Sequence, residues 1–248
     1  MSICDWHEIV TLSCEMAYTR HPELYDLEYA FKDYAREAAT LERIIRERSP
    51  DATTLLDVAC GTGKHLEHLS QQFECEGADL DEGLLDIARE RVPGVPLHHA
   101  DMRNFDLGRQ FDVITCLFSA IGFVGGIDGL TATAHAFARH LNPGGIALVE
   151  PWITPDAWMT NRPHLLTYEE PGFALARATV SGLRDERIST TEMHYLIATA
   201  AGVEHFVENH DPYLFTTDEM RAAFEDAALQ VDYDAEGLIG RGLWISSR

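Results

Sequence analysis

Short apolar runs alternate with helical patterns through the middle of the chain. The runs cover residues 54–59, 75–79, 95–99, 111–117 and 145–152. Between them, two groups of apolar residues recur at helical spacing: Leu84, Leu85 and Ala88, then Leu130, Ala134, Phe137 and Leu141. Strands that alternate with helices at such intervals are typical of βαβ units. The pattern predicts an α/β fold in which helices cover a parallel sheet.

The segment before the first run has the spacing of an amphipathic helix. Apolar side chains recur through residues 32–48, and Pro50 ends the pattern because proline cannot continue a helix. We expect residues 1–48 to form an N-terminal helical cap. Residues 49–152 would then form the core with its ligand site.

The rhythm changes after residue 152. Three extended segments, residues 173–181, 188–199 and 203–212, are joined by short polar or glycine-containing turns. We expect residues 153–215 to be an inserted antiparallel β segment. Its three strands would follow one another along the chain.

The last part of the chain, residues 216–248, returns to the core pattern. Thr216 and Glu219 have the spacing of a capping box, so a helix should begin there. Two final strand candidates follow at residues 229–233 and 242–246. The prediction is a Rossmann-like seven-stranded sheet with flanking helices and an inserted antiparallel β segment.

Charge and composition exclude several classes of function. The 248 residues include 41 Asp and Glu against 19 Lys and Arg, for a net charge of -22. Such a field repels nucleic acid and anionic membrane surfaces, so we expect neither as a partner. The five cysteines form no CxxC pair, and no apolar stretch approaches a membrane span. We therefore expect a cytoplasmic protein with reduced thiols.

The strongest chemical signal is the sequence LLDVACGTG at residues 55–63. It is an apolar strand that breaks into a glycine-containing turn before a helix, where backbone N–H groups approach a ligand closely. Asp79 follows Asp57 by 22 positions, at the end of the next predicted strand. An acid there can accept hydrogen bonds from both hydroxyls of a ribose. The segment predicts a site for a nucleoside cofactor.

The spacing of the glycines bears on which cofactor this is. Dinucleotide binding calls for GxGxxG, and the third glycine position is Leu66 here. Asp57 suits a cofactor with an ammonium group better than one with a pyrophosphate, because two negative charges would repel. S-adenosylmethionine (SAM) is therefore favoured. A nucleotide-cofactor oxidoreductase and a SAM-binding protein without catalysis are the alternatives, since methyl transfer requires no indispensable catalytic residue.

Four segments, residues 56–63, 77–79, 99–102 and 111–114, together resemble the signature segments of class I SAM-dependent methyltransferases. The resemblance implies that Gly61 and Gly63 line the methionine moiety and that Asp79 holds the ribose. Asp101 would meet the adenine amino group, beside Met102. The full set expected to bind SAM is Asp57, Ala59, Gly61, Gly63, Asp79, Leu80, Asp101, Met102 and Tyr34.

Residues 32–38, 65–68, 117–123, 149–152 and 240–243 resemble a narrower family. They are similar to the N,N-dimethyltransferases that complete nucleotide-linked amino sugars for macrolide antibiotics. The chain departs from that family at Ala30 and Phe31, where the resemblance implies a Gly/Lys-rich link. It also departs at Phe123, which replaces a hydrogen-bonding side chain at the family's aromatic or imidazole position. The resemblance implies methylation of a small-molecule amine with release of S-adenosylhomocysteine. Another amine or hydroxyl metabolite is the alternative acceptor.

Candidate acceptor residues come from several segments. Glu150 lies near the end of the last apolar run, at the carboxyl edge of the sheet, where it could take the proton of an amine. Tyr25 could close over the site. Arg241, between two glycines, could pair with a phosphate. Phe123 and Trp152 could form the acceptor wall. The inserted strands would serve as a wall or as the surface of a homodimer, and no metal site is predicted.

Overall fold

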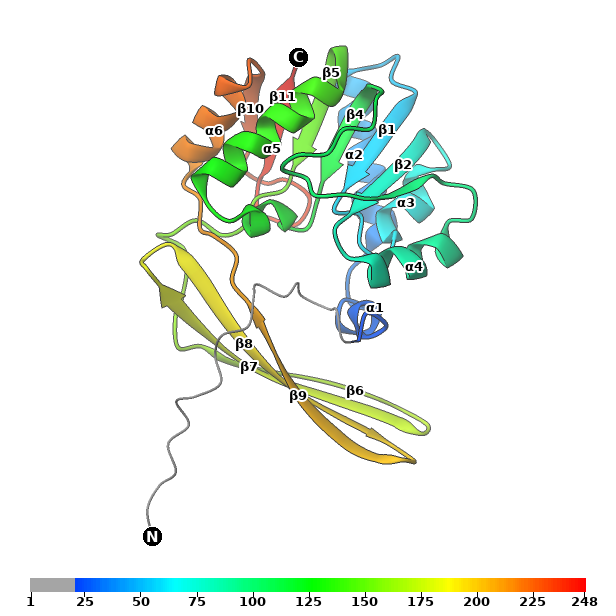
Figure 1. The fold of residues 1–248 in the computed structure, drawn as a ribbon, viewed down its shortest axis with the longest axis vertical. Coiled ribbons are helices and arrows are strands. Elements are labelled where there is room, and N and C mark those ends of the chain that lie inside the picture. Colours follow the sequence, from blue (N-terminus) through cyan, green and yellow to red (C-terminus); the bar gives the residue numbers. More distant parts are fainter. Residues whose placement is uncertain (1–20) are drawn as a thin grey trace.

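The computed structural model describes residues 21–248, so the first part of the expected N-terminal cap lies outside the described residues. The described chain contains a seven-stranded sheet with helices on both faces and a separate four-stranded antiparallel sheet (Figure 1). Among the described helices, none is long and apolar enough to cross a membrane.

The large sheet has the strand order β10-β11-β5-β4-β1-β2-β3. Its strands are β1 (Thr54–Val58), β2 (Glu74–Asp79), β3 (Leu97–His99), β4 (Phe111–Cys116), β5 (Leu141–Val149), β10 (Gln230–Asp234) and β11 (Leu243–Ser247). Neighbours among β1 to β5 pair in parallel, while β11 runs antiparallel to both of its neighbours. The predicted Rossmann-like sheet of seven strands is confirmed. The carboxyl ends of five parallel strands consequently meet at one edge.

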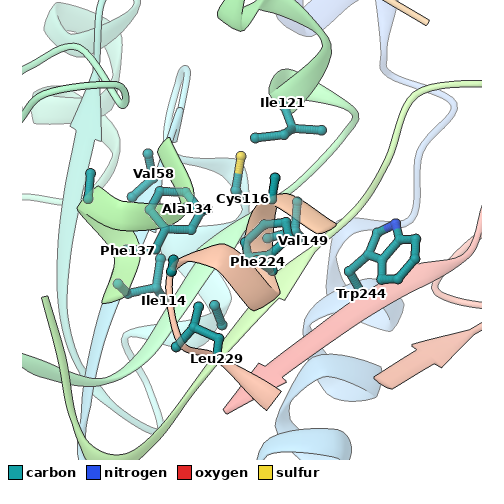
Figure 2. Packing of buried hydrophobic residues seen from close by; sticks show 14 of the residues in the cluster. Val58, Ile114, Cys116, Ile121, Ala134, Phe137, Val149, Phe224, Leu229 and Trp244 are labelled. Atoms are coloured by element: carbon teal, nitrogen blue, oxygen red, sulfur yellow. The ribbon is translucent and has the colours of Figure 1, made fainter. Parts of the chain in front are cut away.

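Helices bury both faces of this sheet. One face carries α2 (Tyr34–Arg48), α3 (Lys64–Leu69) and α4 (Glu82–Arg91), and the other carries α5 (Ile127–His140) and α6 (Thr217–Asp226). Figure 2 shows Phe137 of α5 and Phe224 of α6 packing between these two helices and the strands. The predicted capping box of Thr216 and Glu219 is present at the start of α6. The helical periodicity therefore located the covering helices correctly.

The strand β5 begins earlier than the apolar pattern indicated. Leu141 was expected on the preceding helix, but α5 ends at His140 and Leu141 pairs with Phe111. The register then shifts before Val113 pairs with Ile146. The residues between Leu141 and Ile146 resembled a turn because they include Asn, Pro and two glycines, yet they form an irregularity within the strand. The strand ends at Val149, so Trp152 lies beyond it.

The inserted sheet has four strands, in the order β6-β7-β8-β9. These are β6 (Pro163–Glu170), β7 (Phe173–Arg184), β8 (Ile188–Thr199) and β9 (Gly202–His210). Three of them were predicted, and β6 was missed. As an edge strand that begins with proline and is exposed along most of its length, β6 lacks the alternation that identifies a half-buried strand.

The two faces of the inserted sheet differ. We call the inner face the side of Leu175, Arg177, Thr179, Met193, Tyr195, Ile197, Phe206, Glu208 and His210, where Leu24 of the short helix α1 (Leu24–Glu28) packs into an apolar cluster. The outer face carries exposed apolar side chains, namely Leu165, Val180, Leu196, Val203 and Val207. Only the inner face is covered by described residues of the same chain.

Candidate active site

The turn between β1 and α3 holds its backbone in the left-handed region. Ala59, Gly61 and Gly63 have φ of 59°, 54° and 76°. The N–H of Gly61 donates to Oδ2 of Asp79 at 2.7 Å, and the N–H of Asp81 donates to Oδ1 at 2.8 Å. Burial raises the pKa of Asp79. The acid expected to bind a ribose thus lies against the glycine turn and fixes its shape.

Asp57 lies beneath this turn, inside the sheet. Its side chain is almost fully buried in β1, and Thr115 on β4 donates a hydrogen bond to it at 2.7 Å. Burial raises the pKa of Asp57 to about 6, against the opposing effect of His65. An ionised carboxylate here is held in an unfavourable environment. It would attract a cation bound at the turn.

Tyr25 lies above the same turn. A methyl group placed on Gly61 would approach the ring of Tyr25 to 4.0 Å, and the Tyr25 ring meets Tyr29 edge-on with centroids 4.9 Å apart. Burial raises the pKa of Tyr25, so its phenol stays protonated. The short helix α1 therefore carries an aromatic side chain to the position expected for a residue that closes the site.

A buried charged cluster connects the start of α2 with α3, and it was not predicted from the sequence. Lys32 Nζ lies 3.1 Å from Oε2 of Glu37, which also lies 2.8 Å from Nε2 of His65. The ammonium group sits 3.8 Å from the centre of the Phe118 ring. Burial lowers the pKa of Lys32, although Glu37 opposes this effect. The available signal was Glu37, which precedes buried Leu41 by four residues on the apolar side of the helix.

Glu150 follows β5 directly, and its side chain is fully buried. Its Oε2 accepts a hydrogen bond from the N–H of Phe118 at 2.6 Å. Phe118 and Ser119 have φ of 51° and 66°, an uncommon conformation for residues with side chains. Burial raises the pKa of Glu150, while the positive charges of Lys32 and Arg241 lower it. The predicted acid therefore does reach the carboxyl edge of the sheet.

Several buried polar atoms near this edge lack hydrogen-bond partners within residues 21–248. Two of them are the hydroxyl oxygen of Tyr34, whose ring meets that of His65 edge-on, and Oε1 of Glu150. Buried polar groups are normally hydrogen-bonded, so a ligand with polar groups would account for both. The Tyr34 hydroxyl can donate to a carboxylate such as that of SAM, and the Glu150 oxygen can accept a hydrogen bond from an amine.

Arg241 lies in the loop between β10 and β11. Its guanidinium donates to Oγ of Ser119 at 3.2 Å and lies 5.4 Å from the ring of Trp152. Trp152 in turn donates to Oγ of Ser189 in the inserted sheet at 3.0 Å. The structure thus brings together Arg241 and Trp152, which are far apart in the sequence, on the side of the site that adjoins the insert.

Phe123 is half-exposed on the 3₁₀ helix η1 (Ala120–Val124). Its ring stands perpendicular to that of His210, with centroids 5.9 Å apart. His210 was not singled out in the sequence because it lies in the insert, 87 positions further along the chain than Phe123.

The remaining residues expected to bind SAM follow the ends of β2 and β3. Leu80 is 39% exposed, and its carbonyl accepts a hydrogen bond from His99. Arg103 donates to both oxygens of Asp101 through Nε, at 2.9 and 3.0 Å, which lowers the pKa of Asp101. Met102 packs against the core on the α5 side. The carboxylate of Asp101 is therefore already paired with its own neighbour. In the described part of the chain, no cluster of three or more His, Cys, Asp or Glu could hold a metal ion.

Comparison with known proteins identifies the family of the core. Residues 55–145 match the family model of a methyltransferase domain. The chain is 43% identical over 226 residues to the dTDP-3-amino-3,6-dideoxy-alpha-D-glucopyranose N,N-dimethyltransferase of Streptomyces fradiae, covering 90% of this chain and 88% of the relative. It is 40% identical over 229 residues to the dTDP-3-amino-3,4,6-trideoxy-alpha-D-glucopyranose N,N-dimethyltransferase of Streptomyces venezuelae, covering 91% and 96%.

The fold is shared with a solved structure that contains SAM. This is CalS10, an amino pentose methyltransferase from Micromonospora echinaspora involved in calicheamicin biosynthesis. The TM-score is 0.83 at 38% sequence identity, and the match covers 91% of this chain and 96% of CalS10.

Proposed function

Because the chain belongs to the SAM-dependent N,N-dimethyltransferases of dTDP-linked amino sugars, we propose that it methylates the amine of such a sugar. One observation carries the proposal most directly: buried Glu150 and the guanidinium of Arg241 both contact the Phe118–Ser119 turn. A carboxylate can take up an amine proton, and a guanidinium can hold a diphosphate. Each chemical end of the acceptor would therefore have a partner. Like CalS10, the enzyme would act in antibiotic biosynthesis, in the cytoplasm.

SAM would be held at the glycine turn, where it would supply an electrophilic methyl group. Asp79 would accept hydrogen bonds from the ribose hydroxyls, and Asp57 beneath the turn would favour the positively charged methionine end. The unpartnered hydroxyl of Tyr34 supports a polar ligand at this place. Asp101 would contact adenine after its pair with Arg103 opens. Tyr25 would cover the turn and limit access of water.

Glu150 would prepare the acceptor amine. An ammonium group has no lone pair for methyl transfer, so it must lose a proton before each of two methylations. Oε1 of Glu150 is buried and has no partner among the described residues, and burial makes its carboxylate a stronger base than an exposed one. Lys32 and Arg241 oppose this rise in its pKa. Glu150 would hold the amine in place and receive its proton, directly or through water.

Arg241 would anchor the diphosphate of the acceptor. In a chain of net charge -22, an anionic substrate needs a local cation, and Arg241 is flanked by the rings of Phe118 and Trp152. We expect Arg241→Ala to raise the KM for a dTDP-amino sugar at least tenfold, or about 1.4 kcal/mol, while the Kd for SAM changes less than twofold. Arg43→Ala, which removes an exposed arginine of α2, is the matched control and should change neither constant. An equal loss in both constants would contradict separate anchors.

The decisive experiment is turnover of an acceptor panel with S-adenosylhomocysteine release as the readout. The panel contains dTDP-linked amino sugars, simple amines and phenols. Robust turnover of the nucleotide sugars alone, with a dimethylated product, is the expected result. Turnover of simple amines or phenols alone would end the amino-sugar assignment and leave the methyltransferase assignment intact. SAM binding without any turnover would support the non-catalytic alternative.

For the insert, we propose that both uses considered from the sequence apply, one on each face. The inner face would form a wall of the acceptor site, since His210 lies against Phe123. The outer face, with its exposed apolar side chains, would pair with a second copy of the chain. Exposed apolar patches of this kind commonly mark an interface, and a closed homodimer covers such a patch on both copies.

A further inference from the structure

Lys32 is a cation buried between Glu37 and the ring of Phe118. Its side chain is 3% exposed, and the chain contains only one other lysine, Lys64. Nζ of Lys32 lies 3.1 Å from Oε2 of Glu37, yet it makes no hydrogen bond of normal geometry within residues 21–248. Burying an ammonium group is costly, so an ion pair of this kind is not expected to stabilise the fold strongly. The position of this charge therefore points to a use in the site.

The contacts of Lys32 lead from the cofactor turn to Glu150. Its partner Glu37 lies 2.8 Å from His65 on α3, the helix that begins directly after the glycine turn. Nζ of Lys32 also lies 3.8 Å from the centre of the Phe118 ring, and the N–H of Phe118 donates to Oε2 of Glu150 at 2.6 Å. A continuous series of contacts therefore joins the segment expected to hold SAM to the acid expected to receive the amine proton.

Three neighbours hold the ring of Phe118. Tyr29 meets it edge-on with ring centroids 4.7 Å apart, and the guanidinium of Arg241 lies 5.6 Å from its centre. Lys32 is the closer of the two cations to this ring, and a cation over an aromatic face is attracted to it. Phe118 has a φ of 51°, an uncommon conformation for a residue with a side chain, so contacts must hold it there. The contact with Lys32 thus helps to keep the N–H of Phe118 directed at Glu150.

Lys32 also acts on Glu150 through its charge. The charged or titratable groups that face Glu150 are Lys32, Arg241, Glu37 and the thiol of Cys116. Burial raises the pKa of Glu150, and Lys32 lowers it more than Arg241 does. An ionised carboxylate can accept a proton from an amine, whereas a protonated one cannot. Lys32 is thus the stronger of two cations that keep Glu150 available as a base.

We propose that Lys32 is a positioning residue for deprotonation of the acceptor amine: its contact with the Phe118 ring and its positive charge hold Glu150 in place and ionised. This inference rests on the proposed function and adds a residue that acts through another side chain. Oε1 of Glu150 is buried and has no hydrogen-bond partner in the described chain, so it is the atom left for the amine. Each of the two methylations requires the loss of a proton, and each would depend on Lys32.

A direct titration of Glu150 tests the proposal. NMR of labelled glutamate carboxyl carbons follows it, and the loss of one signal in Glu150→Gln assigns it. We expect Lys32→Met to move this titration to higher pH by about one pH unit or more, because a positive charge near the carboxylate is lost. The kcat for a dTDP-amino sugar near neutral pH should fall about tenfold or more, while the Kd for SAM changes less than about twofold. Lys32→Arg, which keeps the charge, should restore most of both values.

The other lysine of the chain supplies the matched control. Lys64 lies 3.7 Å from Asp26, and Lys64→Met should leave the titration of Glu150 unchanged. Should Lys32→Met not fold, the double variant Lys32→Met with Glu37→Gln keeps the test open, because neither partner of the buried pair is left charged. The titration should again move to higher pH, since Lys32 acts on Glu150 more strongly than Glu37 does.

The outcomes separate this inference from the proposed function. If wild-type enzyme turns over dTDP-amino sugars and Lys32→Met leaves the titration of Glu150 in place, the positioning role is overturned and the function stands. A lower kcat without a shift of the titration would make Lys32 a structural support only, and would also overturn the proposal. If wild-type enzyme turns over no dTDP-amino sugar, the proposed function fails. The titration of Glu150 needs no acceptor, so it still decides whether Lys32 acts on this carboxylate.

Discussion

At the scale of single residues, substitution of Gly61 should affect both protein stability and SAM binding, and the two effects can be measured separately. Its φ of 54° is left-handed, and Tyr25 lies 4.0 Å from the place of a Cβ. Gly108 has a similar φ of 65° but nothing within 4 Å, which makes it a matched control. We expect Gly61→Ala and Gly108→Ala each to lower the free energy of unfolding by about 1 kcal/mol, because alanine is strained in this region.

Only the substitution at Gly61 should affect SAM. Calorimetry should show SAM affinity reduced at least tenfold in Gly61→Ala and lost in Gly61→Val, since a branched side chain takes the space beside the turn. Unchanged affinity in folded Gly61→Val would show that the cofactor binds elsewhere.

The ionised carboxylate of Asp57 should lower the stability of the fold while it favours SAM binding. Its folded pKa of about 6 lies above the ordinary value of 3.8, so the protonated form favours folding and the ionised form opposes it. The stability that the protonated Asp57 contributes is lost as the pH rises from about 4 to about 6. Asp57→Asn keeps an oxygen for Thr115 and carries no charge. We expect its stability advantage over wild type to grow by about 1 kcal/mol between pH 5 and pH 7.

Urea unfolding at the two pH values measures this change. SAM affinity should fall in Asp57→Asn at pH 7, because the carboxylate no longer favours the cation. A stability difference that does not vary with pH would exclude titration of Asp57 in this range.

Site residues whose position follows from a motif or a strand end were predictable from the sequence. Contacts that only the tertiary fold brings together were not. Asp79 was predicted from its place one strand after the glycine turn, and Glu150 from its place near the end of a buried run. Both positions lie at the carboxyl edge of a parallel sheet, which topology alone specifies. The contact between Lys32 and Phe118, like that between His210 and Phe123, joins distant segments with no spacing rule.

At the scale of elements, a buried ion pair joins α1 to the inserted sheet. Arg177 of β7 donates to Oε2 of Glu28 at 2.5 Å, and the two side chains are 12% and 0% exposed. Glu28→Ala would leave the guanidinium buried and unpaired. We expect it to lower the free energy of unfolding by about 3–5 kcal/mol and to weaken SAM binding, because α1 also carries Tyr25. Denaturant titration and calorimetry would measure both effects.

The exposed pair of Arg43 and Glu47 on α2 is the comparison. Removing Glu47 should cost about 0.5 kcal/mol or less, because water already solvates both charges. The double variant Glu28→Met with Arg177→Met should recover much of the stability lost in Glu28→Ala, since it leaves no uncompensated charge. If Glu28→Ala proved as mild as removal of Glu47, the pair would not secure α1.

Elements were predictable wherever burial imposes a period. The strands β1, β2 and β4 are buried on both faces, and α5 has one apolar face, so each leaves a clear pattern. The edge strand β6 is exposed along most of its length, and its partner β7 determines its extent. The sequence of β6 has no periodicity that would predict its pairing with β7.

At the scale of the whole molecule, the outer face of the inserted sheet should control assembly. We expect the wild-type chain to sediment as a dimer and Leu196→Asp as a monomer, because a charge in the middle of an apolar interface cannot be solvated. Ile127→Asp, at a comparably exposed apolar residue on α5, should remain dimeric. Each copy carries a charge of -22, so dimerisation should strengthen with added salt. A monomeric wild-type chain at high salt would contradict the proposed use of this face.

Successive residues of β8 point alternately to the two faces of the inserted sheet, with Met193 and Tyr195 inward and His194 and Leu196 outward. Point mutations can therefore adjust one face at a time. Inserting or deleting a single codon within β8 would exchange the faces of every residue that follows it in the strand. Such a change would damage acceptor recognition and self-association in one step. Length variation during divergence should accordingly be confined to the hairpin turns, such as the one between β8 and β9, while the strand interiors diverge by substitution alone.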